Sequence, residues 1–185
     1  MTPMKLVILD RDGVINYDSD QYIKSPDEWT PLPGSLEAIA LLNQNGFRVA
    51  IATNQSGIGR GLFDMSALNA MHAKMHKALA AVGGRVDAVF FCTHTPEDSC
   101  DCRKPKPGLF LKIAERFGVD LKDVPMVGDS HRDLQAGEAA GCQVMLVRTG
   151  KGMKTLERDD LPKSTQVFDD LAAAARHIVE AKPAA

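Results

Sequence analysis

The sequence predicts an α/β fold with a doubly wound, mostly parallel sheet. Two observations predict it: five short apolar runs are spaced along the chain, and segments with apolar residues at helical spacing lie between them. Alternation of strands and helices with short connections is typical of that architecture. The 185 residues fit one domain over 1–185, because domains average roughly 150 residues.

The predicted strands are near-continuous apolar runs, as expected for strands that are buried on both faces of a parallel sheet. They cover Lys5–Leu9, Arg48–Ala52, Val86–Cys92, Pro125–Val127 and Gln143–Val147. The predicted helices cover Ser35–Asn45, Met65–Val82, Gly108–Phe117, Arg132–Ala140 and Asp169–Ala181. Methionines and leucines form a stripe along the second helix, and we interpret this stripe as core packing.

The composition excludes several classes of protein. Lys and Arg number 22 against 24 for Asp and Glu, so no basic excess favours a nucleic acid as partner. The N-terminus lacks the basic and long apolar segments of a signal peptide, and no run approaches the ~18 apolar residues of a membrane span. We therefore expect a cytoplasmic protein without a membrane partner. A monomer is the expected oligomeric state.

Asp10 and Asp12 stand directly after the first predicted strand. Side chains at i and i+2 of an extended segment point the same way, so these carboxylates share one small space. Asp129, after the fourth strand, is a third candidate, although a helix cap is the alternative for it alone. Clustered carboxylates are unfavourable without a cation, and Mg²⁺ prefers oxygen ligands. The sequence therefore predicts a magnesium site.

Two other segments suit an anion. Thr53–Gly57 follows the second strand with a hydroxyl, amides and backbone N–H groups. Arg103, Lys104 and Lys106 precede the helix that begins at Gly108, where cations oppose the helix dipole unless an anion lies between them. A polar turn and a solvated basic turn are the respective alternatives. Together the segments predict a phosphate site.

Three cysteines and one histidine lie within eleven residues, in the loop 92–102. They are Cys92, His94, Cys100 and Cys102. Three thiolates and one imidazole are a known tetrahedral zinc set, and we expect a closed, structural Zn²⁺ site. Reduced surface thiols are the alternative. Cys142 is expected to be a buried small hydrophobe.

In this order along the chain, these motifs resemble the haloacid dehalogenase superfamily of phosphohydrolases, over roughly Lys5 to Gly150. The motifs are DRDG after the first strand, Thr53 after the second, Lys104 before a later helix and GDSHRD after the fourth. The resemblance implies a Rossmann-like fold and Mg²⁺-dependent phosphatase activity. It assigns Asp10 as the nucleophile that forms an aspartyl-phosphate and Asp12 as general acid and base.

The resemblance also implies ligands. The carboxylates of Asp10 and Asp129 and the backbone carbonyl of Asp12 would hold Mg²⁺, while Thr53 and Lys104 would hold the phosphoryl oxygens. Asp133, four residues after Asp129, could be a carboxylate that supports the metal ligands from behind, but we favour an ordinary acid in the first turn of its helix. The residues expected to contact substrate are Asp18, Ser19, Asp20, Gln21, Thr53, Asn54, Gln55, Ser56, Arg103 and Lys104. Arg103 would recognise a second phosphate or the sugar.

The cysteine loop directly before CRKP narrows the resemblance. With this loop, the sequence resembles the family of D-glycero-D-manno-heptose-1,7-bisphosphate 7-phosphatases, which serve ADP- or GDP-heptose synthesis for lipopolysaccharide or surface glycans. Histidinol-phosphate phosphatases are the alternative, and Glu97, Asp98 and Asp101 could form the acidic pocket that their cationic substrate needs. A nucleic-acid 3′-phosphatase and a non-catalytic zinc scaffold are further, weaker alternatives.

The chain has no room for a separate cap domain, because only 40 residues lie between Asp12 and Thr53. The site should therefore be open, and its specificity should come from loops. These loops are 16–29, 57–63 and the cysteine loop.

Overall fold

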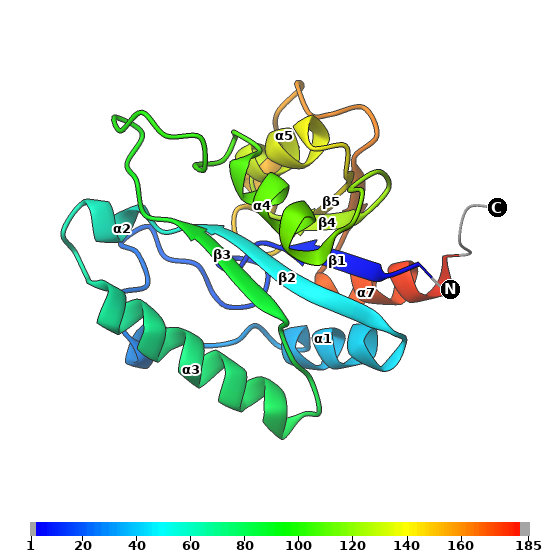
Figure 1. Ribbon diagram of the computed structural model, residues 1–185, viewed down its shortest axis with the longest axis horizontal. Coiled ribbons are helices and arrows are strands. Elements are labelled where there is room, and N and C mark those ends of the chain that lie inside the picture. Colours follow the sequence, from blue (N-terminus) through cyan, green and yellow to red (C-terminus); the bar gives the residue numbers. More distant parts are fainter. Residues whose placement is uncertain (1–2, 182–185) are drawn as a thin grey trace.

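A six-stranded parallel sheet forms the centre of the protein, which a computed structural model describes from residue 3 to residue 181 (Figure 1). The ends of the predicted domain 1–185 lie outside the described residues. The strands are β1 (Lys5–Leu9), β2 (Phe47–Asn54), β3 (Ala88–Cys92), β4 (Pro125–Gly128), β5 (Gln143–Val147) and β6 (Gln166–Phe168). Their order in the sheet is β3-β2-β1-β4-β5-β6, and every neighbouring pair is parallel. The predicted fold class is confirmed.

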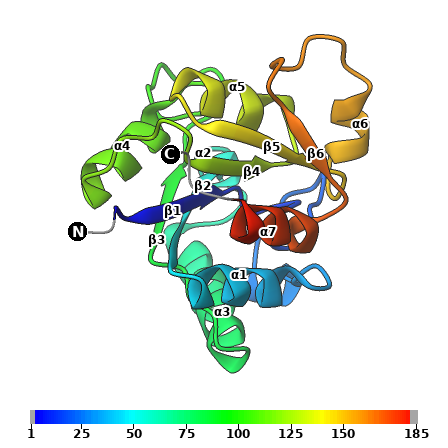
Figure 2. The same ribbon diagram turned by 90° about the vertical axis from the view of Figure 1, so that its right-hand side faces the viewer.

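Helices cover both faces of the sheet (Figures 1 and 2). On one face lie α1 (Ser35–Gln44), α3 (Met65–Ala81) and α7 (Leu171–Glu180), and on the other α4 (Gly108–Phe117) and α5 (His131–Ala139). Two short helices, α2 (Ser56–Gly59) and α6 (Gly152–Leu156), and the 3₁₀ turn η1 (Pro26–Glu28) lie in the connections. No helix within residues 3–181 is long and apolar enough to span a membrane.

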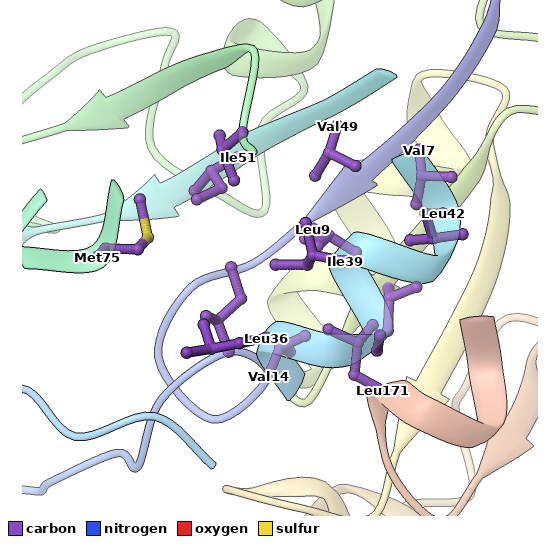
Figure 3. Packing of buried hydrophobic residues seen from close by; sticks show 14 of the residues in the cluster. Val7, Leu9, Val14, Leu36, Ile39, Leu42, Val49, Ile51, Met75 and Leu171 are labelled. Carbon is purple, nitrogen blue, oxygen red and sulfur yellow. The ribbon is translucent and has the colours of Figure 1, made fainter. Parts of the chain in front are cut away.

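The larger core lies between the sheet and the face formed by α1, α3 and α7. Figure 3 shows Val7, Leu9, Val49 and Ile51 of the strands facing Ile39, Leu42 and Leu171 of the helices. A second cluster under α4 and α5 includes Ile8, Ala50, Phe110 and Ile113. Alternate residues of β1 thus enter opposite cores, which is why its sequence is apolar without interruption. Both Met71 and Met75 of α3 are fully buried, as the packing interpretation predicts.

The structure lengthens one predicted strand and adds another. β2 continues to Asn54, because Thr53 and Asn54 pair with Phe91 and Cys92 of β3. β6 was not predicted; it has three residues and sits beside β5 at the edge of the sheet, where burial imposes little apolar pattern.

The topology brings the polar loops to one place. In parallel sheets ligands bind beyond the carboxyl ends of the strands, at the point where the strand order reverses. Here the chain moves outward from β1 to β2 and β3, and then crosses back to β4 on the other side of β1. The loops after β1, β2 and β4 therefore meet at a single crevice.

Candidate active site

A cavity of about 390 Å³ opens at the carboxyl ends of β1, β2 and β4. The structure brings most of the predicted site residues to its wall: Asp10, Asp12, Asp18, Ser19, Asp20, Thr53, Asn54, Gln55, Ser56, Arg103, Lys104 and Asp129. Gln21 is exposed and is absent from this lining, whereas its neighbours Tyr22 and Ile23 belong to it. Residues of all three predicted specificity loops contribute, with Arg60 from 57–63 and Pro96 from the cysteine loop.

Three carboxylates meet on the buried floor of the cavity. Carboxylate oxygens of Asp10, Asp129 and Asp133 lie within 4.8 Å of one another. Asp10 follows β1, and its backbone N–H donates to Val127 of β4 at 3.0 Å, which joins the two strand ends. Asp129 Oδ2 accepts a hydrogen bond from the Lys151 backbone N–H at 2.8 Å.

Two glycines make room for Asp129. Gly13 and Gly150 both have positive φ angles, and a Cβ atom at either position would overlap the Asp129 carboxylate. The chain after β1 and the chain after β5 therefore close around this carboxylate as bare backbone.

Lys104 is buried among these acids. Its Nζ lies 2.6 Å from Asp133 Oδ1 and 3.1 Å from Asp10 Oδ1, and donates to the Ala52 carbonyl at 2.8 Å. Burial works against its charge, but the two carboxylates outweigh burial and raise the pKa of Lys104. Burial likewise opposes the charge of Asp133, yet Lys104 and the hydrogen bonds lower the pKa of that carboxyl. The Lys104–Asp133 pair is thus charged within the floor.

The other two floor carboxylates are short of positive charge. Burial, followed by the Asp133 carboxylate, raises the pKa of Asp10 to about 7, although Lys104 opposes the shift. Burial and the charge of Asp10 raise the pKa of Asp129 well above its ordinary value. A hard divalent cation relieves such crowding through oxygen ligands. This donor set fits Mg²⁺.

Asp12 has a different environment, at the edge of the cavity. Its Oδ1 accepts hydrogen bonds from Arg11 Nε at 2.7 Å and from Asn16 Nδ2 at 2.9 Å, and its Oδ2 accepts one from Gln55 Nε2 at 3.2 Å. The side chain is 22% exposed, against 2% for Asp133. Asp12 therefore reaches the cavity without joining the carboxylate cluster of the floor.

The last residues of β2 order Lys104 as well as the cavity wall. The Asn54 side chain accepts from the Lys104 backbone N–H at 3.0 Å and donates to the Lys104 carbonyl at 3.1 Å. Thr53 Oγ1, at the end of β2, accepts from Gln55 Nε2 at 3.0 Å. Both hydrogen-bonding groups of the Asn54 amide are thus bound to the backbone of Lys104.

The outer wall of the cavity carries cations. Arg60, Arg103 and Arg132 all line it. Burial and the neighbouring guanidinium groups, Arg132 before Arg60, lower the pKa of Arg103. Lys151 also lines the cavity, and its Nζ lies 3.3 Å from Asp18 Oδ2. The mouth of the cavity therefore favours an anionic ligand.

The predicted cysteine cluster is assembled in the loop after β3. The ligand atoms of Cys92, His94, Cys100 and Cys102 lie within 4.8 Å of one another, with His94 facing the thiols through Nδ1. A tetrahedron with Zn–S bonds of about 2.3 Å has edges of about 3.8 Å. Burial and the Cys102 thiol raise the pKa of Cys92 to about 12, so a cation is needed to hold it as a thiolate. The cluster fits Zn²⁺.

Known proteins resemble this chain along nearly its whole length. The sequence model of the HAD-hydrolase-like family matches residues 101–174. D-glycero-β-D-manno-heptose-1,7-bisphosphate 7-phosphatase of Bordetella bronchiseptica is 60% identical, covering 96% of this chain and 99% of the relative. The Pseudomonas aeruginosa enzyme of the same name is 55% identical, covering 95% and 98%. The chain belongs to this heptose-bisphosphate phosphatase family.

Solved structures of the family agree with the fold. The crystal structure of D,D-heptose 1,7-bisphosphate phosphatase from B. bronchiseptica, complexed with magnesium and phosphate, has a TM-score of 0.94 at 60% identity. The enzyme from Burkholderia thailandensis has a TM-score of 0.77 at 57% identity. Each match covers 96% of this chain and 99% of the other. The resemblance to this family that the motifs indicated is confirmed.

Asp133 is an acid in the first turn of α5, as predicted, but it is more than an ordinary helix acid. Its carboxylate does cap α5 in a capping box with Ser130, but it also pairs with Lys104 inside the floor. Oδ2 accepts from the backbone N–H groups of Asp129 and Ser130 at 3.1 and 3.2 Å. Asp133 thus orders the loop that carries Asp129. The signal in the sequence was its i+4 spacing from Asp129.

Sequence reasoning missed other residues that line the cavity. They are Tyr22, Ile23, Arg60, Pro96, Ser130, Arg132 and Lys151. Lys151 could have been found, because it follows the fifth predicted strand just as Asp129 follows the fourth. Arg132 is the second residue of α5, and no local pattern distinguishes it from a solvated arginine.

Proposed function

We propose that this chain is a Mg²⁺-dependent phosphatase that removes the 7-phosphate of D-glycero-β-D-manno-heptose 1,7-bisphosphate. The observation that carries the proposal is the floor of the cavity, where Asp10 contacts Lys104 beside Asp129 in a chain 60% identical to a phosphatase of that name. The product keeps the phosphate at carbon 1, the group needed for later attachment of a nucleotide.

The reaction begins with attack of an Asp10 carboxylate oxygen on phosphorus, which gives an aspartyl-phosphate and releases the sugar. Asp12 protonates the leaving oxygen and then takes a proton from the water that hydrolyses the aspartyl-phosphate. Lys104 neutralises the phosphoryl oxygens, and Thr53 donates its hydroxyl to them. The carboxylates of Asp10 and Asp129 and the carbonyl of Asp12 hold Mg²⁺, which screens the phosphoryl charge from the attacking carboxylate.

The remaining predicted residues have separate roles. Asp18, Ser19, Asp20, Gln55 and Ser56 bind the sugar, and Arg103 binds the second phosphate. The Asn54 side chain hydrogen-bonds both the backbone N–H and the carbonyl of Lys104. This supports an additional role for Asn54 in placing Lys104. Cys92, His94, Cys100 and Cys102 bind one structural Zn²⁺, which orders the loop that carries Arg103.

The charge of the cavity mouth favours a bisphosphate over histidinol phosphate. A cationic substrate needs an acidic pocket, and Glu97, Asp98 and Asp101 are all outside the cavity lining. Arg60, Arg103 and Arg132 line it instead, and guanidinium groups suit a second phosphate. We retain the sequence-based expectations of one domain, a monomer and a cytoplasmic location as part of the proposal.

Kinetics on paired substrates test the proposal. We expect kcat/KM for Mg²⁺-dependent phosphate release to favour heptose 1,7-bisphosphate over histidinol phosphate by a hundredfold or more, with the β-anomer preferred. Asp10→Asn should abolish turnover and leave the fold intact. Phosphate release by Asp10→Asn at the wild-type rate would contradict the nucleophile assignment, and a preference for histidinol phosphate would contradict the substrate.

A further inference from the structure

Arg11, between the two aspartates after β1, points away from the cavity into the larger core. Its side chain is fully buried. Nε donates to Asp12 Oδ1 at 2.7 Å, and Nη2 makes an ionic contact of 2.7 Å with the same oxygen, without hydrogen-bond geometry. A buried guanidinium is costly unless it is paired and hydrogen-bonded. Its pairing here is therefore a strong restraint on Asp12.

A histidine of α3 holds the far end of Arg11. His72 Nε2 lies 3.3 Å from Arg11 Nη1, and Met71 Sδ accepts from the same nitrogen at 4.0 Å. Burial, followed by the charge of Arg11, lowers the pKa of His72 to about 4, so its ring is neutral at pH 7. A neutral Nε2 can accept the guanidinium hydrogen, with the proton of the ring on Nδ1. Arg11 thus links Asp12 to a helix that does not reach the cavity.

The two oxygens of Asp12 are unequal as a result. Oδ1 takes the Arg11 contacts and the Asn16 amide, whereas Oδ2 takes the single, longer hydrogen bond from Gln55. An oxygen with two hydrogen bonds and an ionic contact has no free position for a proton. Oδ2 keeps a free position for a proton, and Asp12 lines the cavity.

We propose that Arg11, anchored by His72, is a positioning residue that fixes the Asp12 carboxyl so that Oδ2 carries the transferable proton. The inference rests on the proposed role of Asp12. In the first step the Oδ2 proton passes to the sugar oxygen, which keeps the electron pair of the breaking P–O bond. In the second step Oδ2 takes a proton from the water whose oxygen bonds to phosphorus as the bond to Asp10 breaks.

p-Nitrophenyl phosphate separates this role from a structural one. Nitrophenolate leaves without being protonated, so only the second step of its turnover needs Asp12. For Arg11→Met we expect a burst of one nitrophenolate per enzyme, at a rate within fivefold of wild type, followed by steady turnover at least thirtyfold slower. Phosphate release from heptose 1,7-bisphosphate should fall by a similar or larger factor, since general acid–base catalysis supplies roughly 10²–10⁴-fold. Equal loss of burst amplitude and steady rate, or no loss of either, would overturn the inference.

Substitutions at His72 provide the second test, which does not depend on the folding of the Arg11 variant. Gln keeps a hydrogen-bond acceptor near the position of Nε2, and Leu removes it. We expect His72→Leu to slow steady turnover about tenfold with the burst rate retained, and His72→Gln to recover it to within about threefold of wild type. His76→Leu, at an exposed position of the same helix, is the matched control and should resemble wild type. Equal behaviour of the Leu and Gln variants at His72 would overturn the anchor.

Asp12→Asn distinguishes failure of the inference from failure of the proposed function. Asp12→Asn should show the same burst with almost no further turnover. If Asp12→Asn turns over normally, the acid–base role of Asp12 fails, and the inference fails with it. If Asp12→Asn shows the burst and Arg11→Met behaves as wild type, the positioning inference alone is wrong.

Discussion

The Lys104–Asp133 ion pair is the interaction whose loss should be most visible in stability. Asp133→Asn keeps the size and shape of the side chain and removes its charge. The amide oxygen can still accept from the backbone of Asp129 and Ser130, but its NH₂ group then faces the Lys104 ammonium. Two donors therefore meet where a carboxylate oxygen lay 2.6 Å from Lys104 Nζ.

The size of the effect follows from burial. Both side chains are 2% exposed, and removing one partner of a buried pair costs about 3–5 kcal/mol. Asp10, 3.1 Å from Lys104 Nζ, still compensates part of the charge, so we expect a loss of about 3 kcal/mol. A chain of this length has an unfolding entropy near 0.4 kcal/mol/K, so the melting temperature should fall by about 8 °C.

Urea unfolding, followed by circular dichroism and by the fluorescence of Trp29, measures the loss. Glu138→Gln, on the exposed side of the same helix, is the control and should change the free energy of unfolding by less than about 0.5 kcal/mol. In a double-mutant cycle, Asp133→Asn and Lys104→Met should together cost at least about 1.5 kcal/mol less than their summed single effects. A loss below about 1 kcal/mol for Asp133→Asn, or additivity in the cycle, would refute the argument.

Three further predictions concern other parts of the molecule. His72 has a pKa of about 4 in the folded protein against an ordinary 6.5. As the pH falls, the unfolded chain therefore binds a proton at His72 before the folded protein does. The folded state loses stability as the pH falls below 6.5, by about 2 kcal/mol at pH 5. His72→Gln should lack this loss when the free energy of unfolding is measured at pH 7 and at pH 5. An equal change in the free energy of unfolding between the two pH values for wild type and His72→Gln would contradict the prediction. Chelation of the Zn²⁺ that we propose for the cysteine cluster should open the loop 92–102 to proteolysis and leave Mg²⁺ affinity, measured by calorimetry, within about twofold. An unchanged cleavage pattern in protein verified to hold no zinc would count against a structural ion. Gly13→Ala places a Cβ on the Asp129 carboxylate at a φ of +86°, so we expect Mg²⁺ affinity to fall at least tenfold by the same method, whereas Gly46→Ala, also at positive φ but in open space, should bind Mg²⁺ as wild type does.

The sequence could predict the sheet because burial dictates it residue by residue. A strand packed on both faces needs apolar side chains throughout, and all five predicted strands coincide with or lie close to observed ones. The sequence did not predict β6, because its Gln166 and Val167 lie in the edge strand of the sheet, where only part of one face is buried. α2 and α6 escaped because helices of four and five residues leave no periodic pattern.

The sequence predicted the site residues that stand at or directly after the end of a strand. Asp10, Thr53 and Asp129 all stand there, and topology alone brings such positions together. Partners fixed by tertiary packing leave no such trace. Lys104 comes from a loop 94 residues after Asp10, and the choice of Asp133 as its partner depends on how α5 is rotated about its axis. For the same reason the contact between Arg11 and α3 could not be read from the DRDG motif.

The charges of the site explain why these residues together favour a divalent cation. Four carboxylates, of Asp10, Asp12, Asp129 and Asp133, face two buried cations, Lys104 and Arg11, while Lys151 is paired with Asp18. Two negative charges are left over, and the neighbouring carboxylates add to burial, the larger cause, in raising the pKa of Asp10 to about 7. A divalent cation balances that excess, whereas a second lysine in the floor would neutralise the nucleophile without leaving a coordination position for a phosphoryl oxygen. Arg11 therefore has to approach Asp12 from the core side, so that its charge counts in the balance while the cavity stays open to Mg²⁺ and phosphate.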